Sequence, residues 1–222
     1  MVKLSIKDNV SKILGGIPSD VIMVAAVKYA SVEQIKELVG SGISELGFNT
    51  YQQMEEVKNA LDSSENWRGK ANLHFIGHLQ SNKAKKVVKL GAKLIQSVDS
   101  LKLATIIDSA AKEQGIIQDI LVQVRTDESK EYGVNPDELE NFLTQLNDLQ
   151  NLKVSGLMTI PPVTEKAEDA RKHFVMMKEL FEKTSALLGR RLDYLSLGMS
   201  DDYKIAIEEG ANMVRVGRVL FN

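Results

Sequence analysis

Short apolar runs rich in β-branched residues alternate with longer polar segments along the chain. The longer segments carry apolar residues at helical spacing, so the pattern predicts strands and helices in alternation. A separate helix is predicted at residues 6–14, before the first strand. The eight runs predicted as strands are residues 21–27, 44–48, 72–76, 93–98, 119–124, 153–158, 193–197 and 212–216.

Several runs are apolar throughout, as residues 21–27 are, which is typical of strands covered on both faces in a parallel sheet. Ser31 fits the N-cap of the next helix and Gly42 its C-terminal stop. Strand-helix units without a low-complexity linker favour an α/β fold with a single (β/α)8 barrel of the TIM type, in one domain over residues 1–222. The alternative is a doubly wound open sheet, but no G-x-G-x-x-G fingerprint follows the first run.

Composition narrows the class of protein. The chain has 222 residues, 43% hydrophobic and 26% charged, with a net charge of −2, so no overall field favours nucleic acid or an anionic membrane. It has no cysteine, which excludes disulfides, thiolate metal sites and a cysteine nucleophile. The start lacks a signal-peptide core and no run is long enough to span a membrane. We expect a cytoplasmic monomer.

In a parallel barrel, reactive side chains lie at the carboxyl ends of the strands. The first run leads directly into Lys28. We expect apolar groups at the barrel mouth to desolvate this amine, which favours the neutral form that a Schiff base requires. The alternative is a lysine that reaches to the rim or pairs with a carboxylate.

The ends of the seventh and eighth runs lie where barrels often bind phosphate. Ser200 precedes a helix predicted to begin near Asp201, so its hydroxyl and the free N–H groups of the helix could bind a phosphate. Gly217 would let the backbone approach the same oxygens. The alternatives are an ordinary N-cap serine and a turn glycine.

Arg215 interrupts the last apolar run one residue before its end. A guanidinium donates hydrogen bonds and cannot accept one, so opposite a pyridine nitrogen it would keep that nitrogen unprotonated and the ring a weak electron sink. The alternative is an ion pair at the barrel mouth, for which Asp99, Glu45 and Asp201 are available.

Two other features carry less chemistry. His78 is predicted at the mouth and His74 within a strand, but no second ligand stands at metal spacing, so no metal is predicted. The basic stretch 83–89 has no interleaved aromatic residues, which is typical of a solvated helix face and not of a nucleic-acid site.

These residues stand in longer segments that resemble the pyridoxal phosphate homeostasis protein family, which is similar to the barrel half of bacterial alanine racemase. The likeness runs through almost the whole chain, and its segments follow the same order as in the family. They are residues 25–28, 46–49, 74–83, 97–100, 156–162, 197–202 and 214–217.

The resemblance implies pyridoxal 5′-phosphate (PLP) as the cofactor, bound as a Schiff base on Lys28. It implies that Ser200 and the backbone at Gly217 and Arg218 bind the phosphate, and that Arg215 faces the pyridine nitrogen. The other pocket residues that it implies are Asn49, Met158 and His78.

Three positions depart from the family's pattern, which commonly has serine at Val27, glutamate at Phe48 and threonine at Arg218. We expect the first two changes to remove polar groups near Lys28. The third removes a hydroxyl from the phosphate site, where backbone N–H groups and the Arg218 charge could compensate.

Two functions follow from the resemblance. The first is a PLP-binding protein of intracellular PLP and amino-acid homeostasis without turnover, and we expect this non-enzymatic role. The second is a PLP-dependent amino-acid racemase, which needs a second proton-transfer group. In the racemases, a tyrosine from the other subunit of a dimer supplies this group. Those enzymes also carry a C-terminal domain, for which we expect no room after Asn222. A more distant alternative is a Schiff-base aldolase acting on a phosphorylated sugar.

Overall fold

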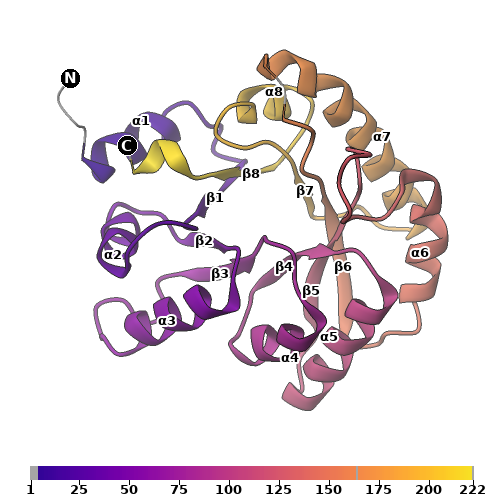
Figure 1. Ribbon diagram of the computed structural model, residues 1–222, viewed down its shortest axis with the longest axis horizontal. Helices are drawn as coiled ribbons and strands as arrows, with labels where there is room; N and C mark the ends of the chain where they lie inside the picture. Colours follow the sequence, from indigo (N-terminus) through magenta and orange to yellow (C-terminus); the bar gives the residue numbers. More distant parts are fainter. Residues whose placement is uncertain (1–4, 164, 222) are drawn as a thin grey trace.

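The computed structural model describes residues 5–163 and 165–221, and within them eight parallel strands close into a barrel surrounded by helices (Figure 1). Each strand pairs with the next along the chain, and β8 pairs with β1. The predicted (β/α)8 barrel is confirmed and the open sheet is wrong. The strands are β1 (Ile22–Ala26), β2 (Glu45–Phe48), β3 (Asn72–Phe75), β4 (Leu94–Val98), β5 (Gln118–Gln123), β6 (Leu152–Met158), β7 (Tyr194–Ser196) and β8 (Met213–Val216).

The predicted helix before the first strand is present as α1, and its Asn9 Nδ2 donates a 3.4 Å hydrogen bond to the carbonyl oxygen of Leu220 near the other end of the chain. The α-helices are α1 (Ile6–Leu14), α2 (Val32–Gly40), α3 (Tyr51–Asp62), α4 (Ser81–Lys89), α5 (Leu101–Gln114), α6 (Leu139–Leu146), α7 (Arg171–Leu187) and α8 (Tyr203–Glu208). Short 3-10 helices are η1 (Pro136–Glu138), η2 (Ala167–Ala170) and η3 (Arg218–Leu220).

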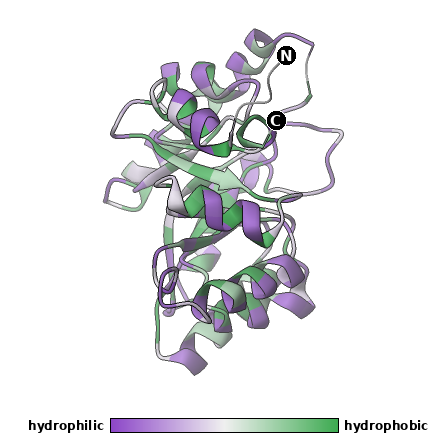
Figure 2. Ribbon diagram, turned by 90° about the vertical axis from the view of Figure 1, so that its left-hand side faces the viewer, coloured by the Kyte–Doolittle hydropathy of each residue, from purple (hydrophilic) through white to green (hydrophobic). Residues whose placement is uncertain are grey.

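Side chains alternate along each strand, so the barrel has an outer and an inner apolar layer. In β1, Met23 and Ala25 belong to the large cluster shared with the helices, whereas Val24 belongs to a smaller cluster inside the barrel. In Figure 2 the helices around the pale and green strands carry both hydrophilic and hydrophobic residues, as expected where one face meets solvent and the other the barrel. The inner cluster consists of Val24, Ile76, Leu94, Leu121, Met158 and Met213.

Local signals set several boundaries. Ser31 is the N-cap of α2, as predicted; its hydroxyl accepts from the N–H of Gln34, and Gln34 Oε1 accepts from the N–H of Ser31. The helix ends at Gly40, and Gly42 follows with a φ of 96°, a conformation that favours glycine. The helix predicted near Asp201 instead begins at Tyr203.

The prediction that residues 1–222 form one domain stays a prediction, and its ends, residues 1–4 and 222, lie outside the described residues. Among the helices of the described chain, none combines the length and apolar character that crossing a bilayer requires.

Candidate functional site

The carboxyl ends of β1, β7 and β8 meet on one side of the barrel mouth. Pairing of β1 with β8 places Val24 beside Arg215. A Cβ on Gly217 would lie 3.2 Å from the carbonyl oxygen of Ala26, so a larger residue would crowd the end of β1. The N–H of Gly217 donates a 3.1 Å hydrogen bond to Ser200 Oγ. The structure therefore brings Ser200 and Gly217 next to the segment that leads into Lys28.

Lys28 lies in a turn two residues beyond the end of β1, and its side chain is exposed. The expected desolvation of its amine is therefore wrong. The reason is that the strand ends before the apolar run does: Val27 is buried in the outer cluster, and the turn carries Lys28 away from it. Lys28 Nζ lies 5.0 Å from the ring centroid of Tyr29, which is itself 82% exposed. The amine is accessible to a small aldehyde.

The turn that carries Lys28 is held by a residue from the following strand-helix unit. Gln53, in the first turn of α3, donates from Nε2 to the carbonyl oxygens of Val27 at 2.7 Å and Ala30 at 3.4 Å. The N–H of Ala30 also donates to the carbonyl of Val27 at 2.9 Å. These bonds fix the backbone on both sides of Lys28 while its side chain stays free.

Arg215 is 4% exposed and lies inside the barrel. Its Nη1 donates to Ser196 Oγ at 2.7 Å and to the Ser196 carbonyl at 2.9 Å, and its Nη2 donates to the Thr159 carbonyl at 2.7 Å. The Nε–H and the second Nη2 hydrogen have no acceptor among the described residues. Burial lowers the pKa of Arg215 to about 10, and attraction by Asp202 opposes that shift.

The alternative ion pair of Arg215 with a carboxylate is wrong for the described residues. Asp201 pairs with Arg218, and Glu45 pairs with His74 and Lys93. A buried guanidinium without a directly paired carboxylate costs stability, because the attraction from Asp202 offsets its desolvation only in part. Its free N–H groups suit an acceptor that enters from the mouth.

The loop between β7 and α8 forms the other part of the site. The half-buried Ser200 accepts a bond from Gly217, and its own hydroxyl hydrogen has no acceptor among the described residues, so it can donate. The Met199 N–H donates to Asp202 Oδ1 at 2.6 Å, and burial raises the pKa of Asp202. Arg218 Nη2 lies 2.8 Å from Asp201 Oδ2; this exposed pair joins the two loops and contributes little to stability.

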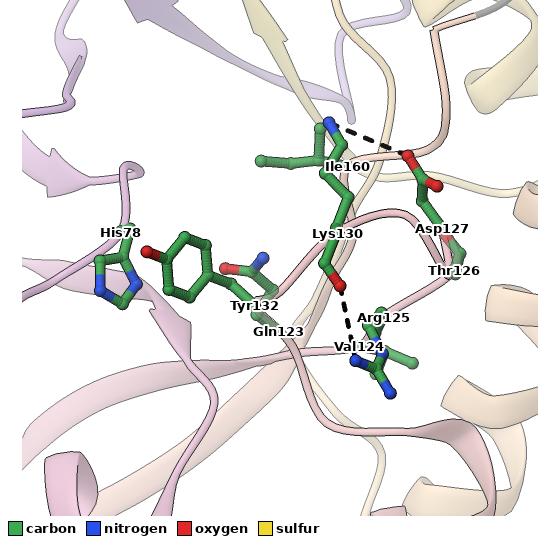
Figure 3. Close-up of a pocket in the computed structure, with 9 residues that line it drawn as sticks. All are labelled: His78, Gln123, Val124, Arg125, Thr126, Asp127, Lys130, Tyr132 and Ile160. Atoms are coloured by element: carbon green, nitrogen blue, oxygen red, sulfur yellow. Dashed lines mark hydrogen bonds and ion pairs between the residues drawn. The ribbon is translucent and has the colours of Figure 1, made fainter.

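The opposite wall of the mouth is formed by two stacked rings. His78, after β3, is exposed and stacks on Tyr132 with ring centroids 3.7 Å apart. Both side chains line a cavity of about 90 Å³, and Figure 3 shows the two rings next to each other. Gly133 shapes this loop, because its φ is 115° and a Cβ there would lie 2.8 Å from the Arg125 nitrogen. The other residues that line the cavity are Gln123, Val124, Arg125, Thr126, Asp127, Lys130 and Ile160.

Two further predicted pocket residues lie near the mouth. Met158, the last residue of β6, is fully buried in the inner cluster beneath it. Asn49 follows β2 and is half-buried. A Cβ on Gly77 would lie 2.5 Å from the Asn49 carbonyl oxygen, so glycine allows the ends of β2 and β3 to meet.

The expectation that Val27 and Phe48 remove polar groups near Lys28 is wrong. Both side chains are fully buried in the outer cluster between strands and helices. At these two departures from the family's pattern, the side chains therefore pack toward the helices and not into the mouth.

Sequence reasoning missed the residues that hold the others in place. They are Gln53 at the Lys28 turn, and Ser196 and Thr159 at Arg215. Ser196 carries a detectable signal, because it is a hydroxyl residue on the inward-facing side of a short apolar strand. The Gln53 and Thr159 contacts join distant parts of the chain, and nothing in the local pattern indicates them.

Within residues 5–163 and 165–221, no group of three His, Asp or Glu side chains could hold a metal ion. The site is thus built from an accessible amine, a buried guanidinium with free donors, and a hydroxyl beside a glycine backbone. This set suits an anionic ligand with a carbonyl group and a ring acceptor.

Comparison with solved structures agrees with this architecture. PipY of Synechococcus elongatus PCC7942, solved with PLP bound, has a TM-score of 0.90 and 30% identity, covering 98% of this chain and 100% of that one. The alanine racemase of Clostridium difficile 630 has a TM-score of 0.76 at 16% identity, covering 97% of this chain and 56% of that one, and shares the fold.

Sequence relatives indicate the same family over nearly the whole chain. The alanine racemase N-terminal domain family matches residues 4–222. The pyridoxal phosphate homeostasis protein of Aquifex aeolicus is 38% identical, covering 96% of this chain and 87% of the relative, and that of Synechocystis is 37% identical, covering 95% of each. This chain therefore belongs to the pyridoxal phosphate homeostasis proteins, within the family of the alanine racemase N-terminal domain.

Proposed function

We propose that the protein binds PLP as a Schiff base on Lys28 and takes part in PLP and amino-acid homeostasis without catalytic turnover. The observation that carries this proposal is the meeting, at one side of the barrel mouth, of an accessible lysine, a buried arginine with free donors and the Ser200–Gly217 pair. PLP bound to PipY, and the name of the Aquifex and Synechocystis relatives, support it.

Each residue has a role that follows from its chemistry. The Lys28 amine condenses with the aldehyde of PLP, forming a C=N bond and releasing water. The Ser200 hydroxyl and the backbone at Gly217 and Arg218 donate to the phosphate. Arg215 directs its free N–H groups at the ring nitrogen, and the nearby side chains of Asn49, Met158 and His78 line the pocket.

PLP supplies an electron-accepting ring when it is bound, and Arg215 weakens this property. The Arg215 guanidinium keeps its protons at neutral pH, so a ring nitrogen opposite it accepts a hydrogen bond and stays unprotonated. Racemisation also requires a proton-transfer group on each face of the substrate. Tyr203 packs against the outer cluster, and the 82% exposed Tyr29 has no hydrogen bond from its hydroxyl among the described residues. Neither tyrosine is held as a second acid-base group.

The first test is the absorption spectrum. Titration of the purified protein with PLP should produce a visible, yellow band, and borohydride should then fix one cofactor on the peptide that contains Lys28. Pyridoxal without phosphate should bind at least about tenfold more weakly, because it lacks the charge-assisted bonds to Ser200 and the backbone. A protein that stays colourless at saturating PLP contradicts the proposal and leaves a sugar-phosphate aldolase as the better reading.

The second test separates a binding protein from a racemase. PLP-loaded protein is incubated with single L-amino acids in deuterated water, and exchange of the α-hydrogen and formation of the D-isomer are followed. We expect neither at ordinary enzymic rates, which are about 1–1000 per second. Sustained conversion that disappears in Lys28→Ala would establish a racemase instead.

A further inference from the structure

A row of buried polar side chains crosses the inside of the barrel and begins at Arg215. Arg215 Nη1 donates to Ser196 Oγ at 2.7 Å, and the Ser196 hydroxyl donates to Gln96 Oε1 at 2.7 Å. Gln96 Nε2 lies 3.1 Å from His74 Nδ1, and His74 Nε2 lies 2.6 Å from Glu45 Oε2. Ser196, Gln96 and His74 are at most 1% exposed. The row joins five strands and ends at the first residue of β2, toward the amino-terminal end of the barrel.

The contacts give this row a direction. The Gln96 amide nitrogen also lies 3.2 Å from Met213 Sδ, so its two hydrogens have acceptors, while its oxygen accepts from Ser196. His74 Nδ1 must then accept, and the ring hydrogen sits on Nε2, from which it is donated to Glu45. Within the row, each residue therefore donates a hydrogen bond to the next one, from Arg215 to Glu45. Reversing the Gln96 amide would place its oxygen beside Met213 Sδ, where neither atom has a hydrogen to donate.

The far end of the row is a carboxylate. Glu45 accepts from Asn72 Nδ2 at 2.7 Å and from Lys93 Nζ at 3.1 Å. Burial would raise the pKa of Glu45, but the hydrogen bonds from His74, Asn72 and Lys93 outweigh it and bring the pKa to about 2. The row thus links a buried cation that has no carboxylate beside it to an ionised carboxylate across the barrel.

We propose that Glu45, His74, Gln96 and Ser196 are positioning residues for Arg215, which aim its guanidinium at the ring nitrogen of PLP. The inference rests on the proposed function. Ser196 and the Thr159 carbonyl occupy three of the guanidinium N–H groups, so the remaining two are fixed in direction. Ser196 is in turn oriented by Gln96, because its hydroxyl hydrogen is already donated. Loss of this link weakens one of the three bonds that orient the guanidinium, so its remaining N–H groups are aimed less well.

The direction of the row can be tested without PLP and without any variant. The chain has three histidines, so nitrogen-15 labelling of histidine gives three separate ring spectra. We expect His74 as the Nε2–H tautomer, with Nδ1 bare. A ring protonated on Nδ1 at neutral pH overturns the inference, because Gln96 could then not donate to it.

The coupling is tested with PLP. In the wild-type protein, PLP binding should shift the ring-nitrogen signals of His74, and PLP labelled at its ring nitrogen should report the hydrogen-bonded, unprotonated state. Ser196→Ala and Gln96→Leu should abolish the His74 response, move the PLP nitrogen signal and raise the dissociation constant of PLP on the order of tenfold, as expected for a weakened bond to a charged group. Ser196→Thr keeps the hydroxyl and should retain the wild-type signals.

Leu121→Ala is the matched control, since Leu121 is fully buried in the inner cluster and its apolar side chain forms no hydrogen bond in the row. It should lower stability and leave both nitrogen signals at their wild-type positions. If Ser196→Ala binds PLP with wild-type signals, or if Leu121→Ala moves them equally, the positioning role is wrong while the proposed function stands. Wild-type protein that takes up no PLP contradicts the proposed function and, with it, the positioning role.

Discussion

Lys28→Ala removes the whole visible band of the PLP-loaded protein and prevents borohydride from fixing the cofactor. The physical reason is that the amine is the only part of the site that can form a covalent bond to the aldehyde, whereas Ser200, Gly217 and Arg215 offer hydrogen bonds alone. Weak noncovalent binding therefore remains. Absorption spectra and the mass of the borohydride-treated protein measure the two effects.

Lys130 offers a matched control for this experiment. It lies in the loop across the mouth, lines the cavity beside His78 and Tyr132, and its side chain is 42% exposed (Figure 3). Lys130→Ala should keep the band, because the Ser200–Gly217 pair lies beside the end of β1 and not beside this loop. A yellow Lys28→Ala protein with cofactor fixed on another lysine would assign the attachment point elsewhere.

The barrel could be predicted from the sequence because its signal is repeated in every unit. Fully apolar runs such as residues 21–27 indicate strands covered on both faces, and alternation with helices leaves few topologies. The same feature hides the details of the site. A run without polar residues does not show which side chains face inward, so the outward direction of Val27 and Phe48 could not be predicted.

The exposure of Lys28 could not be predicted for a related reason. A strand ends where its pairing ends, and β1 stops at Ala26 although the apolar run continues to Val27. The environment of Arg215 depends on β7 and on the segment after β6, which are distant in the chain. The sequence located both residues at the mouth, but the burial of one and the exposure of the other depend on tertiary contacts.

Acid should destabilise the protein partly through Glu45. Its pKa is about 2 in the folded protein against an ordinary value of 4.5. Because the folded pKa is depressed, the carboxylate contributes its full stability above pH 4.5 and loses that contribution as the pH falls through 2. The shift corresponds to roughly 3 kcal/mol, which we reduce to about 2 kcal/mol because its partner Lys93 is partly exposed and water screens that bond.

Glu45→Gln should therefore lower the free energy of unfolding at pH 7 by about 2 kcal/mol, and Tm by about 4–8 °C for a chain of this size. The difference between the two proteins should shrink below pH 4.5 and vanish near pH 2, because the wild-type carboxylate is then protonated and as neutral as the amide. Urea unfolding at pH 7, 4.5, 3.5 and 2.5 measures this. Glu113→Gln removes an exposed carboxylate paired with Lys85 and serves as the control, with a small change that salt reduces. A Glu45→Gln deficit that stays constant across the series would show that the carboxylate is not ionised in the folded barrel, and that the polar row from Arg215 ends without a counter-charge.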